Sequence, residues 1–313
     1  GAFSRDYEGG RALMAGGTFQ GFAAAHEVRQ FELFDSWVEA FMATYRSSSI
    51  AVEDPVVAIT DFEESVVGSD VTRFLAAFER AGLRARFVDV RALAFDGERL
   101  VDPSDGTAID AIYRRAVTSE LLQHPGECDA LIDAVAAQRV CLVGHFRTTV
   151  VHTKVVSIAL FDPATRALLT PEERAFVDAH VPRTYRLEAG APIDLAAVCA
   201  EKDGWIIKPD DDYGAHGVFA GIDYDQAEWE RLVTEKTDAG YVVQEYCLPP
   251  TVELAPVALP ADGDARRVEP WHTMPGLYTY NGRFAGLYVR EGREGIIALD
   301  HGGLVAPSFR VDC

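Results

Sequence analysis

DGWIIKPDDDYGAHGVFAG, residues 203–221, is the stretch around which we expect the rest of this chain to fold. Its apolar run, 205–207, predicts a buried strand that ends at Lys208, because Pro209 cannot continue a regular ladder. An acidic loop with two glycines follows over 210–217, and then a second apolar run. Such a loop can cover a nucleotide triphosphate, because its N–H groups can face phosphate oxygens and the lysine supplies positive charge. The alternative is a β-hairpin with an acidic turn and an extended surface lysine.

Lysine is rare in this chain, and its few lysines fall into two groups. Only four of the 29 Lys and Arg residues are lysines. Lys202 and Lys236 lie in polar stretches with helical patterns. Lys154 and Lys208 lie beside apolar runs, where an arginine would not replace a compact ammonium geometrically. The second pair therefore suits contacts to different phosphates of one nucleotide.

The composition excludes several classes of protein. With 313 residues, 48% hydrophobic and 25% charged, the chain has the composition of a globular protein with two or three subdomains. Its net charge of −20 argues against nucleic acid or an anionic membrane as the main partner. Five cysteines without a CxxC pair favour a reducing compartment. We recognise neither a signal peptide nor an apolar run of ~20 residues, so the sequence predicts a cytoplasmic protein.

From residue 55 the pattern alternates between strands and helices. Strands are predicted at 56–60, 86–90 and 109–113 and a helix at 71–81, which is typical of parallel βαβ units. Ligands of such sheets gather at the carboxyl ends of the strands. The polar residues at these ends are Asp61, Glu63, Glu64, Ser65, Arg114 and Arg115, and a further strand at 140–143 is followed by His145, Phe146 and Arg147. We expect Ser65, Arg114 and Arg115 to bind substrate, the alternative being ordinary loop and edge charge.

The remaining pattern divides the chain into three regions. Helices are predicted at 22–45, 150–160 and 226–236, a strand at 241–246, an irregular stretch at 249–275, and β-structure at 277–309 with a turn at Asn281-Gly282. The predicted regions are an N-terminal segment with a long helix (1–50), a Rossmann-like subdomain (51–145), and a nucleotide-binding and catalytic region (146–313).

Five motifs follow one another along the chain. They are Tyr113-Arg114-Arg115, Lys154, Ile206-Ile207-Lys208-Pro209 with Gly214 and Gly217, Val243-Gln244-Glu245-Tyr246, and Ala285-Gly286-Leu287-Tyr288-Val289-Arg290-Glu291. Their types and order resemble the ATP-grasp superfamily, most closely the circularly permuted branch that contains the glutathionylspermidine synthases and related C–N ligases. The resemblance covers residues 140–311 and, more weakly, 55–139.

The resemblance implies an α/β ATP-grasp fold and an ATP-dependent carboxylate–amine ligase that uses ATP and Mg²⁺. Its substrates would be a small-molecule or peptide carboxylate and an amine. The residues implied to contact ATP are Lys154, Lys208, Gly214, His216, Gly217, Gln244, Glu245 and Tyr246. Arg290 is implied to face the transferred phosphate, the alternative being a surface arginine paired with Glu291 or Glu294.

The chemistry of such a ligase needs little covalent participation by the protein. ATP converts the carboxylate into an acylphosphate, which the amine then displaces. Positioning and charge neutralisation, by Lys154, Lys208 and Arg290, would supply the catalysis. The loop 210–217 would close to keep water from the acylphosphate.

The metal ligands are where this chain departs from the family pattern. Permuted members carry an E-x-N-like pair near the N-terminal end, and residues 1–21 contain none. Asp212, four residues after Lys208, is the favoured magnesium ligand, with Asp6 and Glu8 as further candidates. Two alternatives to a ligase therefore remain: a nucleotide-binding homologue without ligase chemistry, acting as a sensor or assembly partner, and an enzyme that transfers phosphate to a stable product.

Overall fold

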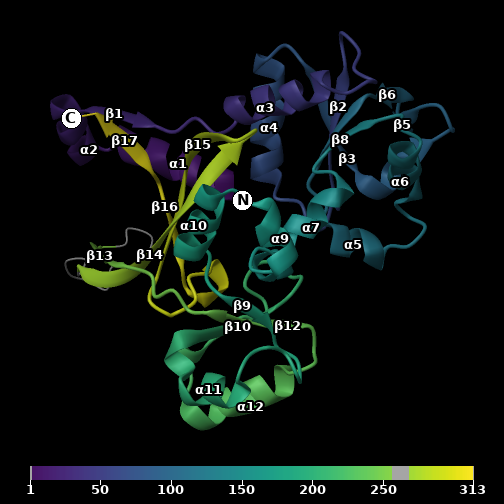
Figure 1. Ribbon diagram of the computed structural model, residues 1–313. Helices are drawn as coiled ribbons and strands as arrows, with labels where there is room; N and C mark the ends of the chain where they lie inside the picture. Colours follow the sequence, from purple (N-terminus) through teal and green to yellow (C-terminus); the bar gives the residue numbers. More distant parts are fainter. Residues whose placement is uncertain (1, 256–267, 313) are drawn as a thin grey trace. The chain divides into compact units, whose positions relative to one another are not determined.

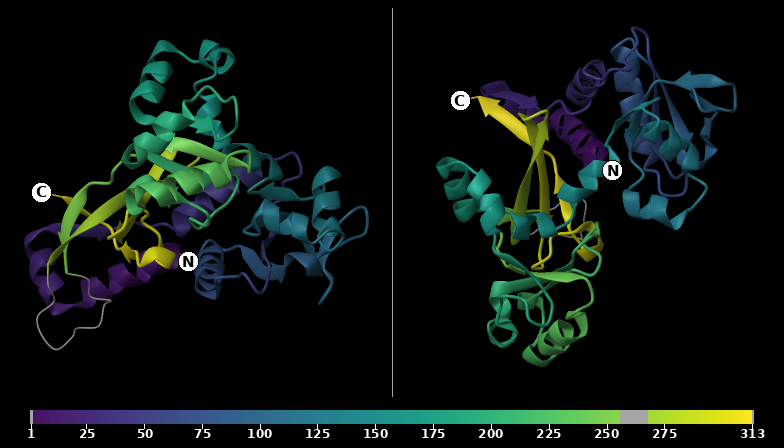
Figure 2. Two further views of the ribbon diagram at one scale, coloured as in Figure 1. Left: turned by 90° about the horizontal axis from the view of Figure 1, so that it is seen from below. Right: turned by 45° about the vertical axis from the view of Figure 1, so that its right-hand side comes forward.

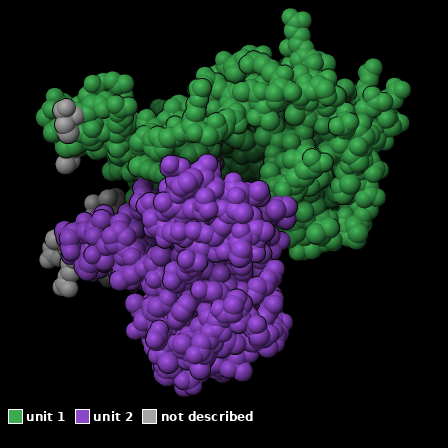
Figure 3. Space-filling view, in the orientation of Figure 1, with its two compact units in different colours: residues 1–148, 276–288, 306–313 green, residues 149–275, 289–305 purple. Residues whose placement is uncertain are grey.

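The computed structural model describes residues 2–255 and 268–312 and has the predicted α/β class. The chain divides into two compact units (Figure 3): unit 1 contains residues 1–148, 276–288 and 306–313, and unit 2 contains 149–275 and 289–305. Residues 256–267, within the stretch predicted to be irregular, lie outside the described residues. On either side of them that prediction is wrong, because strands cover 251–254 and begin again at Glu269. None of the helices in the described ranges has the length and apolar character needed to cross a bilayer.

A four-stranded parallel sheet forms the centre of unit 1 (Figure 1). Its strands are, in spatial order, β3 (Arg84–Asp89), β2 (Val56–Asp61), β7 (Ala111–Arg114) and β8 (Cys141–Val143). β2 is buried throughout, because helices cover both faces. The helices on one face are α3 (Asp35–Arg46) and α4 (Gly68–Arg80), and those on the other are α5 (Thr118–Gln123) and α6 (Asp129–Ala136). The predicted parallel βαβ pattern is confirmed.

Smaller elements complete unit 1. They are the helices α1 (Ala2–Ala15) and α2 (Gly17–Ala25), the antiparallel pair β1 (Glu27–Gln30) and β17 (Phe309–Asp312), and an antiparallel sheet of β4 (Ala94–Phe95), β5 (Leu100–Asp102) and β6 (Thr107–Ile109). The single strand predicted at 109–113 is divided at Asp110 between β6 and β7. The division follows from Asp110, whose carboxylate accepts a hydrogen bond from Val56 N at 2.8 Å and so joins β2 instead of continuing β6.

The single helix predicted at 22–45 is wrong, because two contacts interrupt it. Val28 pairs with Val311 in the β1–β17 ladder, a partner far along the chain that local periodicity cannot reveal. The carboxylate of Glu32 then accepts hydrogen bonds from the backbone N–H groups of Phe34, Asp35 and Ser36, each at 2.8 Å. These are the unpaired donors of a new helix start, so α3 begins at Asp35.

A four-stranded antiparallel sheet forms the centre of unit 2. Its strands are, in spatial order, β11 (Phe219–Ala220), β10 (Trp205–Pro209), β12 (Tyr241–Glu245) and β9 (Thr184–Arg186). The helices α11 (Leu195–Ala200) and α12 (Gln226–Lys236) lie together along one face (Figure 1). Ile207 and Val243 point to these helices and pack with the fully buried Trp229. The predicted strands at 205–207 and 241–246 are confirmed, but the predicted end at Lys208 is wrong, because Pro209 still pairs with Tyr241 at the end of β10.

The remaining elements connect these sheets. The helices are α7 (Thr149–His152), α8 (Val155–Ala159), α9 (Pro163–Leu168) and α10 (Pro171–His180), and the 3₁₀ turns are 90–92, 146–148, 202–204, 221–223 and 299–301. A further sheet has the order β13 (Thr251–Leu254), β14 (Glu269–Tyr280), β15 (Arg283–Gly292) and β16 (Leu304–Ala306). β14 and β15 form the long hairpin seen from two sides in Figure 2, and both residues of its predicted turn, Asn281 and Gly282, have positive φ.

Candidate functional site

Lys208 lies on the face of the β9–β12 sheet that α11 and α12 do not cover. Side chains alternate along a strand, and Ile207 faces the helices, so Ile206 and Lys208 face the other way. Gln244 is paired with Ile206 in the ladder and therefore faces the same side as Lys208. The motif lysine and the predicted base-reading glutamine thus meet on one sheet face.

A chain of hydrogen bonds fixes these two side chains. The Nζ of Lys208 donates to Oε1 of Gln244 at 2.7 Å, and Nε2 of Gln244 donates to Oγ1 of Thr184 at 2.7 Å. The hydroxyl of Thr184 in turn donates to the carbonyl of Pro182 at 3.0 Å. The amide of Gln244 is therefore held in one orientation. Sequence reasoning missed Thr184, because only its ladder position opposite Gln244 identifies it.

Lys154 contributes a second ammonium to this face. The helix predicted at 150–160 is interrupted: α7 ends at His152, and the amide of Lys154 donates to the carbonyl of Asp210 at 2.9 Å instead of to a helical carbonyl. Its Nζ donates to the carbonyl of Asp212 at 2.9 Å. Burial, and then the charge of Lys154, lower the pKa of Lys208. Across the described ranges, no carboxylate lies within 4.0 Å of either ammonium.

The three adjacent aspartates of the loop have separate partners. Oδ2 of Asp210 lies 3.1 Å from Nη1 of Arg186. Oδ1 of Asp211 lies 3.4 Å from Nε2 of His152. Oδ1 of Asp212 accepts from the amide of Tyr213 at 2.7 Å. The carboxylates are thus separated by their own contacts, and none of them neutralises the two lysines.

The glycine loop connects β10 to β11, as predicted. Gly214 has φ +71°, Ala215 +65° and Gly217 +64°. A Cβ on Gly217 would lie 2.9 Å from the Tyr241 hydroxyl and 3.1 Å from Cγ of Pro209, so no side chain fits there. A Cβ on Gly214 would meet only the ring of His216, at 3.4 Å. The loop therefore packs closely against the sheet at Gly217. The side chain of His216, beside it, is largely exposed.

The predicted residues after β12 have their own contacts. Oε2 of Glu245 accepts from the amide of Arg183 at 2.8 Å. The hydroxyl of Tyr246 donates to the carbonyl of Gly295 at 2.7 Å, and burial raises the pKa of Tyr246. These contacts join the end of β12 to the segment that precedes β9 and to the loop after β15.

Arg290 is half-buried near the end of β15. The two carboxylates considered as its surface partners have further contacts of their own. Oε1 of Glu291 accepts from Oγ1 of Thr273 at 2.9 Å, and burial raises the pKa of Glu291. Oε2 of Glu294 lies 3.1 Å from Nδ1 of His301.

The predicted metal ligands each have contacts within their own unit. Asp6 and Glu8 lie in unit 1, where Asp6 accepts from the amide of Ser308 at 3.1 Å and Glu8 forms an ion pair with Arg73. Burial raises the pKa of Asp6 to about 6. Within 2–255 and 268–312, no group of three or more His, Cys, Asp or Glu side chains is placed to hold a metal. Mg²⁺ bound with a nucleotide takes only one or two carboxylates besides phosphate oxygens, so Asp212 stays a predicted ligand, and we derive no step through the metal.

The predicted substrate residues have different surroundings in unit 1. Arg115 lies 3.5 Å from Asp61 and 3.4 Å from Asp70, so two carboxylates hold its guanidinium. The hydroxyl of Ser65 donates to Oε1 of Glu120 at 3.2 Å. Arg114 points to the opposite face of the sheet from Arg115, because the two residues are adjacent at the end of a strand.

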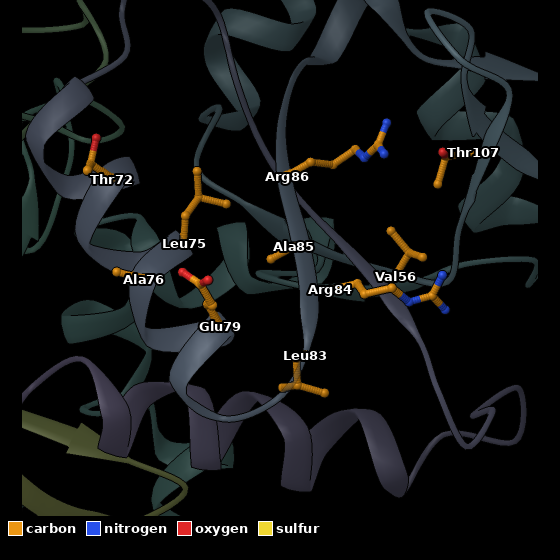
Figure 4. A pocket seen from close by; sticks show the side chains of 10 residues that line it. All are labelled: Val56, Thr72, Leu75, Ala76, Glu79, Leu83, Arg84, Ala85, Arg86 and Thr107. Carbon is orange, nitrogen blue, oxygen red and sulfur yellow. The ribbon is translucent and has the colours of Figure 1, made fainter.

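A groove of about 640 Å³ lies between α4 and β3, away from all of these residues (Figure 4). Its arginines, Arg84 and Arg86, have carboxylate partners, Asp54 at 3.1 Å and Asp102 at 2.8 Å. Both arginines of the groove are therefore already paired with carboxylates.

Comparisons with known proteins give distant likenesses in structure. No protein-family model matches the chain, and no curated protein sequence matches it. The structure is similar to a glutathione synthetase-like effector from Globodera pallida in its apo form, with TM-score 0.47 and 10% identity over 88% of this chain and 56% of that one. It is also similar to a D-cycloserine synthetase, with TM-score 0.40 and 12% identity over 81% and 75%. The chain thus spans little more than half of the effector, and at TM-scores below 0.5 neither likeness decides what it does.

Proposed function

We propose that this chain binds ATP on the sheet face that carries Lys154 and Lys208. The observation that carries the proposal is electrostatic. Burial, and then the charge of Lys154, lower the pKa of Lys208, and the ammonium groups of Lys154 and Lys208 each donate only to a neutral oxygen. Holding two like charges together in a partly buried place costs free energy, which a triphosphate would offset.

The surrounding residues would then divide the nucleotide between them. The loop around Gly214 and Gly217 would offer backbone N–H groups to phosphate oxygens, with His216 beside it. The end of β12 would contact the adenine through Gln244, Glu245 and Tyr246.

We further propose that the bound ATP drives amide formation. A carboxylate oxygen of the acid attacks the γ-phosphorus, and ADP leaves. The nitrogen of the amine then attacks the acyl carbon, phosphate leaves, and the amine loses a proton. Lys208 and Arg290 would neutralise the charge on the transferred phosphate, and the loop 210–217 would exclude water.

The acylphosphate gives the direct test of this chemistry. Hydroxylamine reacts with acylphosphates to form hydroxamates, which iron(III) colours. The protein should form hydroxamate from a panel of carboxylic acids only when ATP is present, with ADP released in equal amount. ATP binding without hydroxamate or ADP under any combination would contradict the ligase.

Arg290→Lys tests the role of the arginine. The lysine retains one positive charge but loses the planar fork that reaches two oxygens. We expect ATP binding to remain and ADP release to slow by roughly a hundredfold, the scale of losing one charge-stabilising donor. Unchanged turnover would assign Arg290 to the surface.

A second candidate is a nucleotide-binding protein without ligase chemistry. The observation that favours it is that Asp210, Asp211 and Asp212 already have separate partners, with no metal-binding group in the described parts of the chain. Such a protein would bind ATP in calorimetry and return it unchanged after prolonged incubation with acids and amines.

A further inference from the structure

We propose that Arg114 and His145, at the carboxyl ends of β7 and β8, bind the carboxylate of a small acid. The role of that acid as a substrate rests on the ligase function proposed above, whereas the site itself is argued from unit 1 alone. It lies on the α6 face of the parallel sheet, because Arg114 alternates with the α4-facing Tyr113.

The first observation is that Arg114 has no counter-charge. Four arginines whose side chains are at most 30% exposed serve for comparison: Arg86, Arg91, Arg115 and Arg166, which are 30%, 28%, 17% and 26% exposed. Each of them has a carboxylate within 4.0 Å. Arg114 is also half-buried, yet no carboxylate in the described residues comes within that distance. Burial lowers the pKa of Arg114, as expected for a cation without a nearby anion.

The second observation is that the guanidinium of Arg114 is fixed in place. Its Nε donates to the carbonyl of Gly144 at 2.6 Å and its Nη1 to the carbonyl of Ala116 at 2.5 Å. The ring of Phe146 lies 5.3 Å from its central carbon. Gly144 has φ +81°, and a Cβ there would lie 3.2 Å from the carbonyl of Arg114, so only glycine lets the two strand ends approach this closely. A guanidinium held this way still has N–H donors to offer and loses little entropy on binding.

The third observation is a second donor beside it. Nδ1 of His145 lies 3.1 Å from the amide of Arg147 and accepts its hydrogen bond, so in the neutral ring the proton is on Nε2. Burial, Arg147 and Arg114 all lower the pKa of His145. The positive charge of Arg114 therefore disfavours a charged His145 ring, and an anion beside both residues would offset that repulsion.

The buried hydroxyl of Thr60 completes the surroundings. Thr60 is paired with Arg114 in the parallel ladder, so both side chains are on the α6 face. Thr60 is fully buried, and its Oγ1 has no hydrogen-bond partner within the part of the chain that the structure describes. Buried hydroxyls usually have a hydrogen-bond partner, so this one is a further donor on the α6 face that the described protein groups leave unused.

A carboxylate fits this arrangement better than a larger anion. The planar fork of an arginine matches two coplanar oxygens, and one further ring N–H completes a small site. Phosphate would present a third oxygen at the same centre, which the planar guanidinium fork cannot reach.

The test is a titration observed at the ring of His145 by NMR, with malonate, acetate and inorganic phosphate as separate probes. We expect malonate and acetate to shift the His145 ring signals saturably, and phosphate to bind at least tenfold more weakly. Arg114→Gln should weaken carboxylate binding at least tenfold, the scale of one charged hydrogen bond. Arg139→Gln, which removes the same charge at an exposed position of unit 1, should leave the titration unchanged.

Three outcomes would overturn the site: equal affinity for carboxylates in Arg114→Gln, phosphate binding as tightly as malonate, or no shift in the wild-type protein. If Arg114→Gln fails to fold, His145→Gln observed by calorimetry with malonate makes the same comparison. Because the titration contains no ATP, a protein that forms no hydroxamate can still show the site. Conversely, if the His145 ring signals do not shift, calorimetry of the wild-type protein with ATP still tests the proposed nucleotide site separately.

Discussion

At the scale of single residues, Lys208 decides whether the proposed nucleotide site is correct. Its ammonium donates to Gln244, and burial and the charge of Lys154 lower its pKa. A bound anion would therefore stabilise its charged form. Lys208→Ala should weaken ATP binding by roughly 10- to 100-fold, the value of a hydrogen bond to a charged group. Lys236→Ala, at the end of α12, removes a lysine that pairs with Glu235 and lies over the ring of Tyr241 on the helix-covered side of the sheet, and should change affinity little. Calorimetry with ATP measures both, and equal affinity in the two variants would reject the site.

Asp6 gives a prediction about stability and pH. Its pKa in the folded protein is about 6, above the usual 3.8, so folding disfavours its ionised form. Stability from the protonated carboxyl is complete below pH 3.8 and is lost as pH rises through about 6. Asp6→Asn retains an oxygen that can accept from the amide of Ser308 but cannot ionise. The variant should be more stable by up to about 3 kcal/mol near pH 8 and equal to the wild type near pH 3.5.

Urea unfolding at the two pH values measures the effect of Asp6→Asn. Glu39→Gln removes one charge at an exposed position of unit 1 and should alter neither value. A wild-type protein that is as stable as Asp6→Asn near pH 8 would show that the carboxylate of Asp6 is not disfavoured by burial.

At the scale of elements, the glycine loop offers a matched pair of substitutions. Gly214→Ala and Gly217→Ala share the strain of a positive φ. Only at Gly217 would the new Cβ also collide with Tyr241 and Pro209. Gly217→Ala should therefore loosen the 210–217 loop more than Gly214→Ala does. Hydrogen exchange across the loop should be faster in Gly217→Ala, and ATP should protect the loop less. Equal exchange in both variants would mean that the contact with the sheet does not hold the loop.

The same loop shows what local sequence could and could not reveal. The strand at 205–207, the glycine loop and the strand at 241–246 were predictable, because short apolar runs and glycine are local signals, whereas Pro209 was a misleading signal because it lies within β10. The interruption of the 150–160 helix at Lys154 could not be predicted. The amide of Lys154 donates a hydrogen bond to the carbonyl of Asp210, which lies far along the chain. The helix predicted at 22–45 failed for the same reason, since β17 pairs with β1.

The arginine pair illustrates the limit for the site. Alternation alone places Arg114 and Arg115 on opposite faces, so their separation could be predicted. The carboxylates that neutralise Arg115, Asp61 and Asp70, come from a strand end and a helix start that only the folded sheet brings together. Which of two adjacent arginines lacks a counter-charge is therefore a property of the fold and not of the motif.

At the scale of the whole molecule, the net charge opposes the proposed ligand. The chain carries −20, whereas ATP is itself strongly negative and its proposed site holds only a few cations. At low ionic strength, about 10 mM, the Debye length is roughly 30 Å, and an approaching anion senses most of the negative charge. Near 150 mM the length falls to about 8 Å, and only the charges around Lys154 and Lys208 remain effective. Salt should therefore help ATP to reach the site, although salt weakens most contacts between opposite charges.

The prediction is that the association rate of ATP rises as salt is increased from about 10 mM to about 150 mM. Stopped-flow fluorescence with a fluorescently labelled ATP measures this rate, and labelled adenosine, which has no phosphate, should show almost no dependence on salt. The dissociation rate should rise over the same range, because the contacts of phosphate with Lys154 and Lys208 are screened once formed. An association rate that falls with salt would mean that the local field of the lysines outweighs the negative charge of the whole chain, so that the acidity of this protein lies away from the path by which the nucleotide enters.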